Sequence, residues 1–258
     1  MRLLWVFFVI AVLVGGARDV LADGCEDVDD VKTWCAPELL TLGNEVCAFE
    51  PPKPQAEGKR TLIIYLHGVI QPDGNMQWNQ QRGAARVGSK YGFTVMMPRG
   101  RRGIGPTGME DWWTWPTAID TRVRYEESLV KEWMAARVAL ESRMGKPFDR
   151  VIVFGFSNGA YYATSLAMRG RLEVDGYGLF AGGSGAAYHE VEGRKTKNRV
   201  PIGVAWGEGD PSFEKQVALA KLLKRMRWPS KGFAHPRAGH AMTDEEVFEV
   251  LTFLGVLR

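Results

Sequence analysis

"RVIVFGFSNGA", residues 150–160, joins a short apolar run to a serine that lies between two glycines. The run is rich in β-branched residues, as buried parallel strands are. Gly155, Ser157 and Gly159 then follow the G-x-S-x-G pattern, in which a tight turn from strand to helix strains the backbone of the serine. We expect glycine on both sides because a side chain there would collide with the neighbouring helix and strand. The stretch therefore predicts a buried strand, a tight turn and a helix that starts beside Ser157.

Strands and helices alternate along the rest of the chain from residue 60 on. Apolar runs that predict further strands lie at 61–68, 91–100, 174–183, 200–210 and 232–240, a helix is expected at 76–90, and residues 123–144 show helical spacing. Such alternation predicts a single α/β domain with a mostly parallel sheet and helices on both faces. Because ligands bind at the carboxyl ends of the strands in such sheets, functional residues are expected directly after the strands.

A nucleophilic serine needs a base to take its proton and an acid to hold that base in the right tautomer. When the serine lies on a strand-to-helix turn, the order along the chain is serine, then aspartate or glutamate, then histidine. Asp210 ends one predicted strand and His240 ends the segment before the last helix, so both stand where this order requires. We therefore predict that Ser157, Asp210 and His240 form a catalytic set.

Three nearby residues are rivals for these roles. His235 is the alternative base, although it lies inside a predicted strand and is followed by Pro236. Glu208 and Asp244 are alternative acids, but Glu208 comes before the turn and Asp244 follows the histidine. Their positions fit the expected order less well.

Acyl transfer also needs N–H donors for the negatively charged oxygen of the tetrahedral intermediate. One donor is expected from the backbone of Asn158, the residue directly after the serine. The other is expected from the loop "LHGVIQ" after the first strand, where Val69 is the first choice and Ile70 the second.

No sequence pattern indicates a cofactor or a metal ion. The glycines at 103–108 spell G-x-G-x-x-G, but Pro106 interrupts them and no strand-to-helix turn surrounds them, as a dinucleotide site would need. The basic stretch at 193–199 is predicted to be a solvated loop. A net charge of +3 on 258 residues gives no reason to expect a nucleic acid as partner.

The first residues are predicted to be a signal peptide. One arginine precedes an apolar run over 3–14, and Ala22 ends a small-residue cleavage site. The run is short for a transmembrane helix, so an uncleaved membrane anchor is the weaker alternative. We expect export to a secreted or periplasmic location with removal of 1–22, a cysteine-containing segment over 23–59 and a catalytic domain over 60–258.

All three cysteines, Cys25, Cys35 and Cys47, lie in that N-terminal segment. An exported chain meets an oxidising compartment, so one disulfide and one remaining thiol are expected. The pairing cannot be read from the sequence.

The segment "MEDWWTWPTA", residues 109–118, holds three tryptophans within four residues. It follows a strand end and should lie on the same side of the sheet as the serine. Trp113 and Trp115 are predicted to form an apolar wall of the substrate pocket, because a flat ring binds a large area with few lost rotamers. The alternative is a buried cluster that packs under the long helix.

Together these motifs resemble the α/β-hydrolase superfamily, through "FDRVIVFGFSNGA" (148–160), "WGEGD" (206–210) and "AGHAM" (238–242). Within it the chain is similar to secreted esterases of the polyhydroxybutyrate depolymerase and feruloyl or acetylxylan esterase type. Those proteins share the Asp-Arg-Val lead into the elbow and a Trp-x-Trp segment, here 113–115. The resemblance covers residues 60 to 255, but "HGVIQPDG" (67–74) replaces the usual His-Gly-x-x-Gly run.

These residues and the resemblance together imply hydrolysis of a small-molecule or polymeric carboxylic ester through an acyl-enzyme on Ser157. His240 would carry the proton, Asp210 would orient it, and no cofactor would take part. The same groups could cleave a peptide, and a non-catalytic binding protein on this fold is a further alternative. The sequence does not define the acyl group, the alcohol or the oligomeric state.

Overall fold

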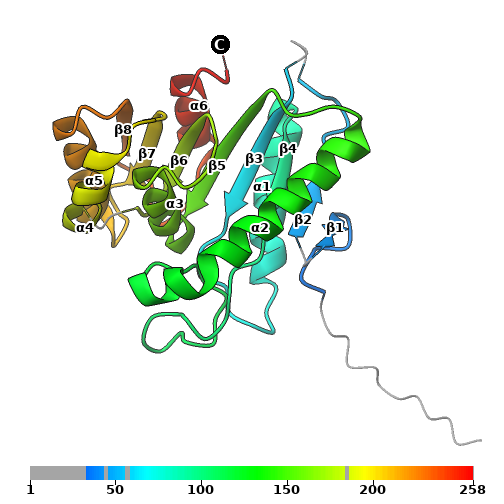
Figure 1. Cartoon of the computed structure of the whole chain (residues 1–258), viewed down its shortest axis with the longest axis horizontal. Helices are drawn as coiled ribbons and strands as arrows, with labels where there is room; N and C mark the ends of the chain where they lie inside the picture. Colours follow the sequence, from blue (N-terminus) through cyan, green and yellow to red (C-terminus); the bar gives the residue numbers. More distant parts are fainter. Residues whose placement is uncertain (1–32, 44–45, 56–58, 184–185, 258) are drawn as a thin grey trace, which may run out of the picture. The chain divides into compact units, whose positions relative to one another are not determined.

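The strand expected from "RVIVFGF" is β5, and it lies in the middle of an eight-stranded sheet in the computed structural model (Figure 1). The structure describes residues 33–43, 46–55, 59–183 and 186–257, and the part from Thr33 on is one unit. The predicted signal peptide and Cys25 lie outside the described residues.

The strands run in the order β1-β2-β4-β3-β5-β6-β7-β8 across the sheet. All neighbouring pairs from β4 to β8 are parallel, and only β1 with β2 and β2 with β4 pair antiparallel among the described strands. Their bounds are β1 Leu40–Leu42, β2 Val46–Phe49, β3 Thr61–Leu66, β4 Thr94–Met97, β5 Arg150–Phe156, β6 Gly176–Phe180, β7 Ile202–Gly207 and β8 Ser230–His235. The predicted fold class, a mostly parallel sheet with helices on both faces, is confirmed.

The helices cover the sheet in two layers (Figure 1). Side chains of α2, α3 and α5 form one apolar core with the sheet, those of α1 and α6 form the other, and α4 contacts α3 and α5. The helices are α1 Met76–Tyr91, α2 Ile119–Met144, α3 Asn158–Met168, α4 Ala186–Lys195, α5 Phe213–Arg225 and α6 Asp244–Phe253. Because β3 to β7 lie between these layers, nearly all of their residues are buried, which explains their continuous apolar runs.

Three sequence expectations are corrected at the ends of elements. The last strand stops at His235 instead of running to residue 240, because Pro236 cannot donate to the ladder and a turn follows, with the Ala238 N–H bonded to the His235 carbonyl. The stretch expected as a loop at 193–199 begins inside α4, which ends at Lys195. Helix α2 starts four residues earlier than expected.

The described part of the N-terminal cysteine segment, from Thr33 on, does not form a unit of its own. It supplies β1 and β2, which extend the sheet beyond β4, so the expected boundary at residue 60 does not separate two units. Strands of only three and four residues give little periodic signal, which explains why the sequence did not reveal them.

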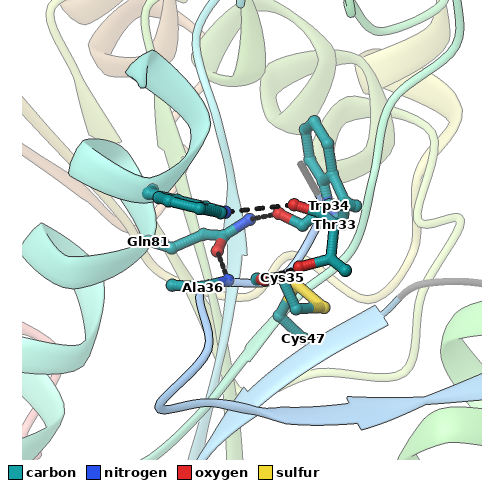
Figure 2. Close-up of a disulfide and its surroundings, with 7 residues drawn as sticks. Thr33, Trp34, Cys35, Ala36, Cys47 and Gln81 are labelled. Atoms are coloured by element: carbon teal, nitrogen blue, oxygen red, sulfur yellow. Dashed lines mark hydrogen bonds between the residues drawn. A yellow bond between two sulfur atoms is a disulfide. The ribbon is translucent and has the colours of Figure 1, made fainter. Parts of the chain in front are cut away.

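A disulfide between Cys35 and Cys47 connects the chain ahead of β1 to β2. Figure 2 shows the Gln81 side chain of α1 bonded to both neighbours of Cys35: it donates to the Trp34 carbonyl and accepts from the Ala36 N–H, each at 2.8 Å. A crosslink over a separation of 12 residues restricts the unfolded chain. Such a crosslink stabilises the fold by about 3 kcal/mol.

Among the described helices, none is both long enough and apolar enough to cross a membrane.

Candidate active site

Ser157 lies at the turn from β5 to α3, in the backbone conformation that its glycine neighbours predicted. Its φ of 52° and ψ of −119° are in a region that non-glycine residues rarely adopt. A Cβ on Gly155 would lie 2.6 Å from the Gly159 carbonyl oxygen. One on Gly159 would lie 2.6 Å from the His67 carbonyl oxygen and would overlap that of Leu66. The two glycines therefore let α3 approach β3 and β5 closely enough to hold the serine at the carboxyl edge of the sheet.

Ser157, His240 and Asp210 form a chain of hydrogen bonds that crosses three loops. The serine Oγ lies 2.9 Å from His240 Nε2, and His240 Nδ1 lies 3.0 Å from Asp210 Oδ2. Asp210 follows β7 and its side chain is completely buried, whereas His240 follows β8 and exposes 42% of its side chain. A carboxylate acceptor on Nδ1 keeps the proton on that nitrogen and leaves Nε2 free to accept one.

The Asp210 carboxylate is held ionised by donors that the sequence analysis missed. Burial on its own would raise the pKa of Asp210, but hydrogen bonds outweigh it and keep the pKa below the usual value. The Ser212 hydroxyl and N–H both lie 2.7 Å from Oδ1, and Gln216 Nε2 lies 3.3 Å from Oδ2. A serine two residues after an aspartate in a turn is the sequence signal that would have indicated the Ser212 bonds.

The rival residues lie in other environments. His235 faces α6, where its Nε2 lies 3.0 Å from the Glu249 carboxylate. Asp244 pairs with Arg86 and Lys90 of α1 at 2.6 and 3.1 Å. Glu208 is exposed. Neither His235 nor Asp244 is bonded to Ser157 or His240, so both belong to contacts between surface elements.

The backbone N–H groups of the two predicted oxyanion donors have no acceptor among the described residues. In the part of the chain that the structure describes, no hydrogen bond uses the backbone N–H of Val69 or Asn158. The N–H of Ile70, the second choice, donates to the Trp113 carbonyl at 3.0 Å, so this alternative is wrong. Asn158 begins α3, where the first N–H groups of a helix lack internal acceptors and favour negative charge.

The prediction of a pocket wall is corrected for Trp115. Its side chain exposes 0% of its surface, stacks on Tyr162 with a centroid distance of 5.9 Å and packs edge-on against Trp133. Trp113 is half-buried between Trp34, at 5.5 Å, and the guanidinium of Arg99, at 4.4 Å. A substrate-binding role for Trp113 stays a prediction. Trp115 instead belongs to a buried cluster, which was the alternative.

His67, directly after β3, is a buried neutral histidine next to this site. Its Nε2 accepts the Gly100 N–H at 3.0 Å and its Nδ1–H donates to the Gly68 carbonyl at 2.5 Å. Burial lowers the pKa of His67 to about 4, although the bond to Gly68 acts in the opposite direction. A protonated ring would lose the acceptor that the Gly100 N–H uses.

We expect His67 to make the fold sensitive to acid. Between pH 6.5 and 4 the unfolded chain binds a proton at this histidine and the folded chain does not, so stability falls as the pH falls through that window. The loss at pH 4 should reach about 3 kcal/mol relative to pH 7. Urea unfolding at pH 7, 5.5 and 4 would measure it in the native protein and in His67→Gln, whose amide oxygen can keep the acceptor. Parallel pH curves for the two proteins would contradict this assignment.

Within the described residues, no group of three or more histidine, cysteine or acidic side chains is arranged to hold a metal ion.

The sheet order and the strand–serine–helix elbow define a class of proteins, the α/β-hydrolase fold, and solved structures of this class match the chain. Esterase PE8 is 17% identical, over 81% of this chain and 99% of that chain, with a TM-score of 0.55. Zea mays acyl-protein thioesterase 2 is 18% identical, over 81% and 97%, with a TM-score of 0.54. Esterase B from Lactobacillus rhamnosis, solved with a tributyrin phosphonate inhibitor, is 13% identical, over 82% and 80%, with a TM-score of 0.58.

The chain belongs to the dienelactone hydrolase family, whose profile matches residues 79–248, more than half of the chain. No curated protein sequence matched it. At the identities given above, the structural likeness concerns the fold. Family and fold together indicate a hydrolase and support ester hydrolysis.

Proposed function

We propose that this chain hydrolyses carboxylic esters by covalent catalysis at Ser157. The observation that carries the proposal is the unbroken pair of hydrogen bonds from Ser157 Oγ to His240 Nε2, at 2.9 Å, and from His240 Nδ1 to Asp210 Oδ2, at 3.0 Å. Proton transfer from a serine requires a base at this distance and a group that holds the base in the correct tautomer. The exposed side chain of His240 and the buried side chain of Asp210 also fit these roles, because only the histidine must reach a leaving group.

In the first half of the reaction, Ser157 Oγ attacks the ester carbonyl carbon while His240 Nε2 takes the hydroxyl proton. The carbonyl oxygen becomes negatively charged and accepts hydrogen bonds from the N–H groups of Asn158 and Val69. The tetrahedral intermediate then expels the alcohol, which leaves with the proton from His240. The acyl group remains as an ester of Ser157.

In the second half, a water molecule gives a proton to His240 and its oxygen attacks the acyl carbon. The same two N–H groups hold the oxyanion, and Ser157 leaves with the proton from His240, which frees the carboxylic acid. Asp210 stabilises the imidazolium in both halves and stays ionised, since its donors hold its pKa below the usual value.

The test is labelling with an alkyl fluorophosphonate, whose phosphorus reacts with an activated serine and mimics the tetrahedral intermediate. Mass spectrometry of the digested protein should find a single adduct, on the peptide that contains Ser157. Prior unfolding of the protein should abolish the reaction, because the serine is activated only in the folded site. An unlabelled Ser157 in the folded protein would favour a non-catalytic binding protein and would overturn the proposal.

For the substrate, we propose the narrower class of polyhydroxybutyrate, feruloyl or acetylxylan esters. The sequence resemblance over the elbow and the Trp-x-Trp segment supports it. Hydrolysis rates should be compared between these esters, p-nitrophenyl esters of graded chain length and peptide substrates. Faster cleavage of a peptide than of every ester would favour a serine peptidase.

We also propose that the chain is exported and cut after Ala22. The disulfide between Cys35 and Cys47 supports an oxidising compartment, where such bonds persist. Mass spectrometry of protein from the producing cell should find Asp23 at the N-terminus and a single disulfide. An intact Met1 in protein from outside the cytoplasm, or reduced Cys35 and Cys47, would contradict this.

A further inference from the structure

One buried side chain touches both chain segments that carry the proposed oxyanion donors. The backbone N–H of Trp115 donates to the side-chain oxygen Oδ1 of Asn158 at 2.8 Å, and its indole Nε1–H donates to the His67 carbonyl at 2.7 Å. Asn158 carries one donor itself, and His67 lies two residues before Val69, which carries the other. Trp115 therefore links the start of α3 to the loop after β3.

The aromatic contacts of Trp115 strengthen the same link. Its ring is nearly parallel to Tyr162 of α3, with an interplanar angle of 7°, and its centroid lies 4.7 Å from that of His67. Each segment that carries a donor is thus held by one hydrogen bond and one ring contact from the same residue. Because the indole is fully buried, its hydrogen bond to the His67 carbonyl does not compete with water.

The loop that carries Val69 is fixed on its other sides as well. The Gly68 N–H donates to Gln80 Oε1 at 2.9 Å, and Ile70 exchanges two backbone hydrogen bonds with Trp113 at 2.9 and 3.0 Å. These bonds use the N–H groups on both sides of Val69 and leave its own N–H unused. None of these bonds reaches Asn158. The hydrogen bond from the Trp115 N–H does.

We infer that Trp115 is a positioning residue for the oxyanion hole, and this inference rests on the function proposed above. Oxyanion donors stabilise the transition state only when both lie 2.7–3.1 Å from the position of the oxygen. The two donors here come from different elements, so their separation depends on what joins those elements. Trp115 fixes that separation before substrate binds, and it does so without touching the substrate.

The test compares Trp115→Phe with a matched variant, Trp133→Phe. Both tryptophans are fully buried, contact each other and Tyr162, and lose the same atoms on substitution. Within the described residues, the Trp133 Nε1 has no hydrogen-bond partner, so its loss removes no link to either donor segment. Trp115→Phe keeps the ring contacts and the backbone bond to Asn158 but removes the bond to the His67 carbonyl.

We expect Trp115→Phe to lower kcat roughly 10- to 100-fold, as a small misplacement of catalytic groups does, while KM changes less than about twofold. The inhibition constant of a boronic acid, which forms a tetrahedral adduct on the serine, should rise by the same factor as kcat/KM falls. Trp133→Phe should leave both quantities unchanged even if its melting temperature falls equally. Asn158→Ala, which removes the other bond of Trp115, should lower kcat in the same way, and its effect should not add fully to that of Trp115→Phe.

Unchanged kcat and boronate inhibition in folded Trp115→Phe, or equal losses in both tryptophan variants, would overturn the inference. Parallel assays of Ser157→Ala separate this failure from that of the proposed function. If Ser157→Ala is inactive and Trp115→Phe behaves as Trp133→Phe does, only the positioning role fails. If Ser157→Ala keeps its turnover, both fail.

Discussion

Replacement of Ser157 by alanine is expected to abolish ester hydrolysis and to leave the fold intact. The substitution removes the atom that would form the acyl bond, while the free N–H groups of Asn158 and Val69 remain for residual stabilisation of the oxyanion. We expect kcat/KM to fall roughly 10⁴- to 10⁶-fold. The measurement is the rate of p-nitrophenyl ester hydrolysis at high enzyme concentration, with purity checked by active-site titration of the native protein.

The fold should survive because Ser157 is only half-buried and its hydroxyl bonds only to His240 among the described residues. The free energy of unfolding should change by no more than about 0.5 kcal/mol. Ser128→Ala is the matched control, since this exposed serine of α2 bonds only to the carbonyl of Tyr125 in its own helix. Turnover within tenfold of the native rate in folded Ser157→Ala would disprove covalent catalysis at this residue.

The elbow could be predicted from the sequence because five consecutive residues carry its pattern. A Cβ at Gly155 would overlap the start of the adjoining helix, and one at Gly159 would overlap Leu66 and His67 at the end of the neighbouring strand β3. Asp210 and His240 lie far from the serine in the sequence, but parallel strands bring their carboxyl ends to one edge. A residue directly after β7 or in the loop after β8 is therefore near the serine by topology alone.

The surroundings of the site could not be predicted in the same way. The bonds of Trp115 to Asn158 and His67 join residues 43 and 48 positions apart, and they depend on how one loop packs between two others. The sequence predicts only that a tryptophan is large, apolar and in need of an acceptor when buried. It therefore led to the interpretation of Trp115 as a pocket wall, whereas the acceptor of its indole N–H is a backbone carbonyl inside the protein.

The last strand is shorter than the sequence predicted, yet the histidine chosen from it still lies beside the serine. The sequence run continued the strand to His240, but the turn at Pro236 ends β8 at His235. In the sheet, His235 is turned toward Glu249 of α6, while the loop that follows carries His240 back to the serine. Chain order pointed to the histidine that lies 2.9 Å from Ser157 Oγ, even though the strand assigned to it was too long.

Replacement of His240 by alanine should remove the base and lower kcat by roughly 10⁴-fold or more, whereas His235→Ala should not lower it. The physical reason is distance and direction: His240 Nε2 lies 2.9 Å from Ser157 Oγ, and His235 lies against a glutamate on another element. Since the His240 side chain is 42% exposed, its removal leaves an opening that a free imidazole can enter.

Added imidazole should therefore restore part of the activity of His240→Ala in proportion to the fraction of neutral imidazole, and it should not affect Ser157→Ala. Steady-state hydrolysis at constant pH and increasing imidazole concentration measures this restoration, and the uncatalysed rate with imidazole alone is subtracted. His235→Ala serves as the matched histidine variant, and its expected defect is a modest loss of stability from the contact with Glu249. The reverse pattern, an inactive His235→Ala and an active His240→Ala, would mean that the base is His235 and that the site rearranges before it reacts.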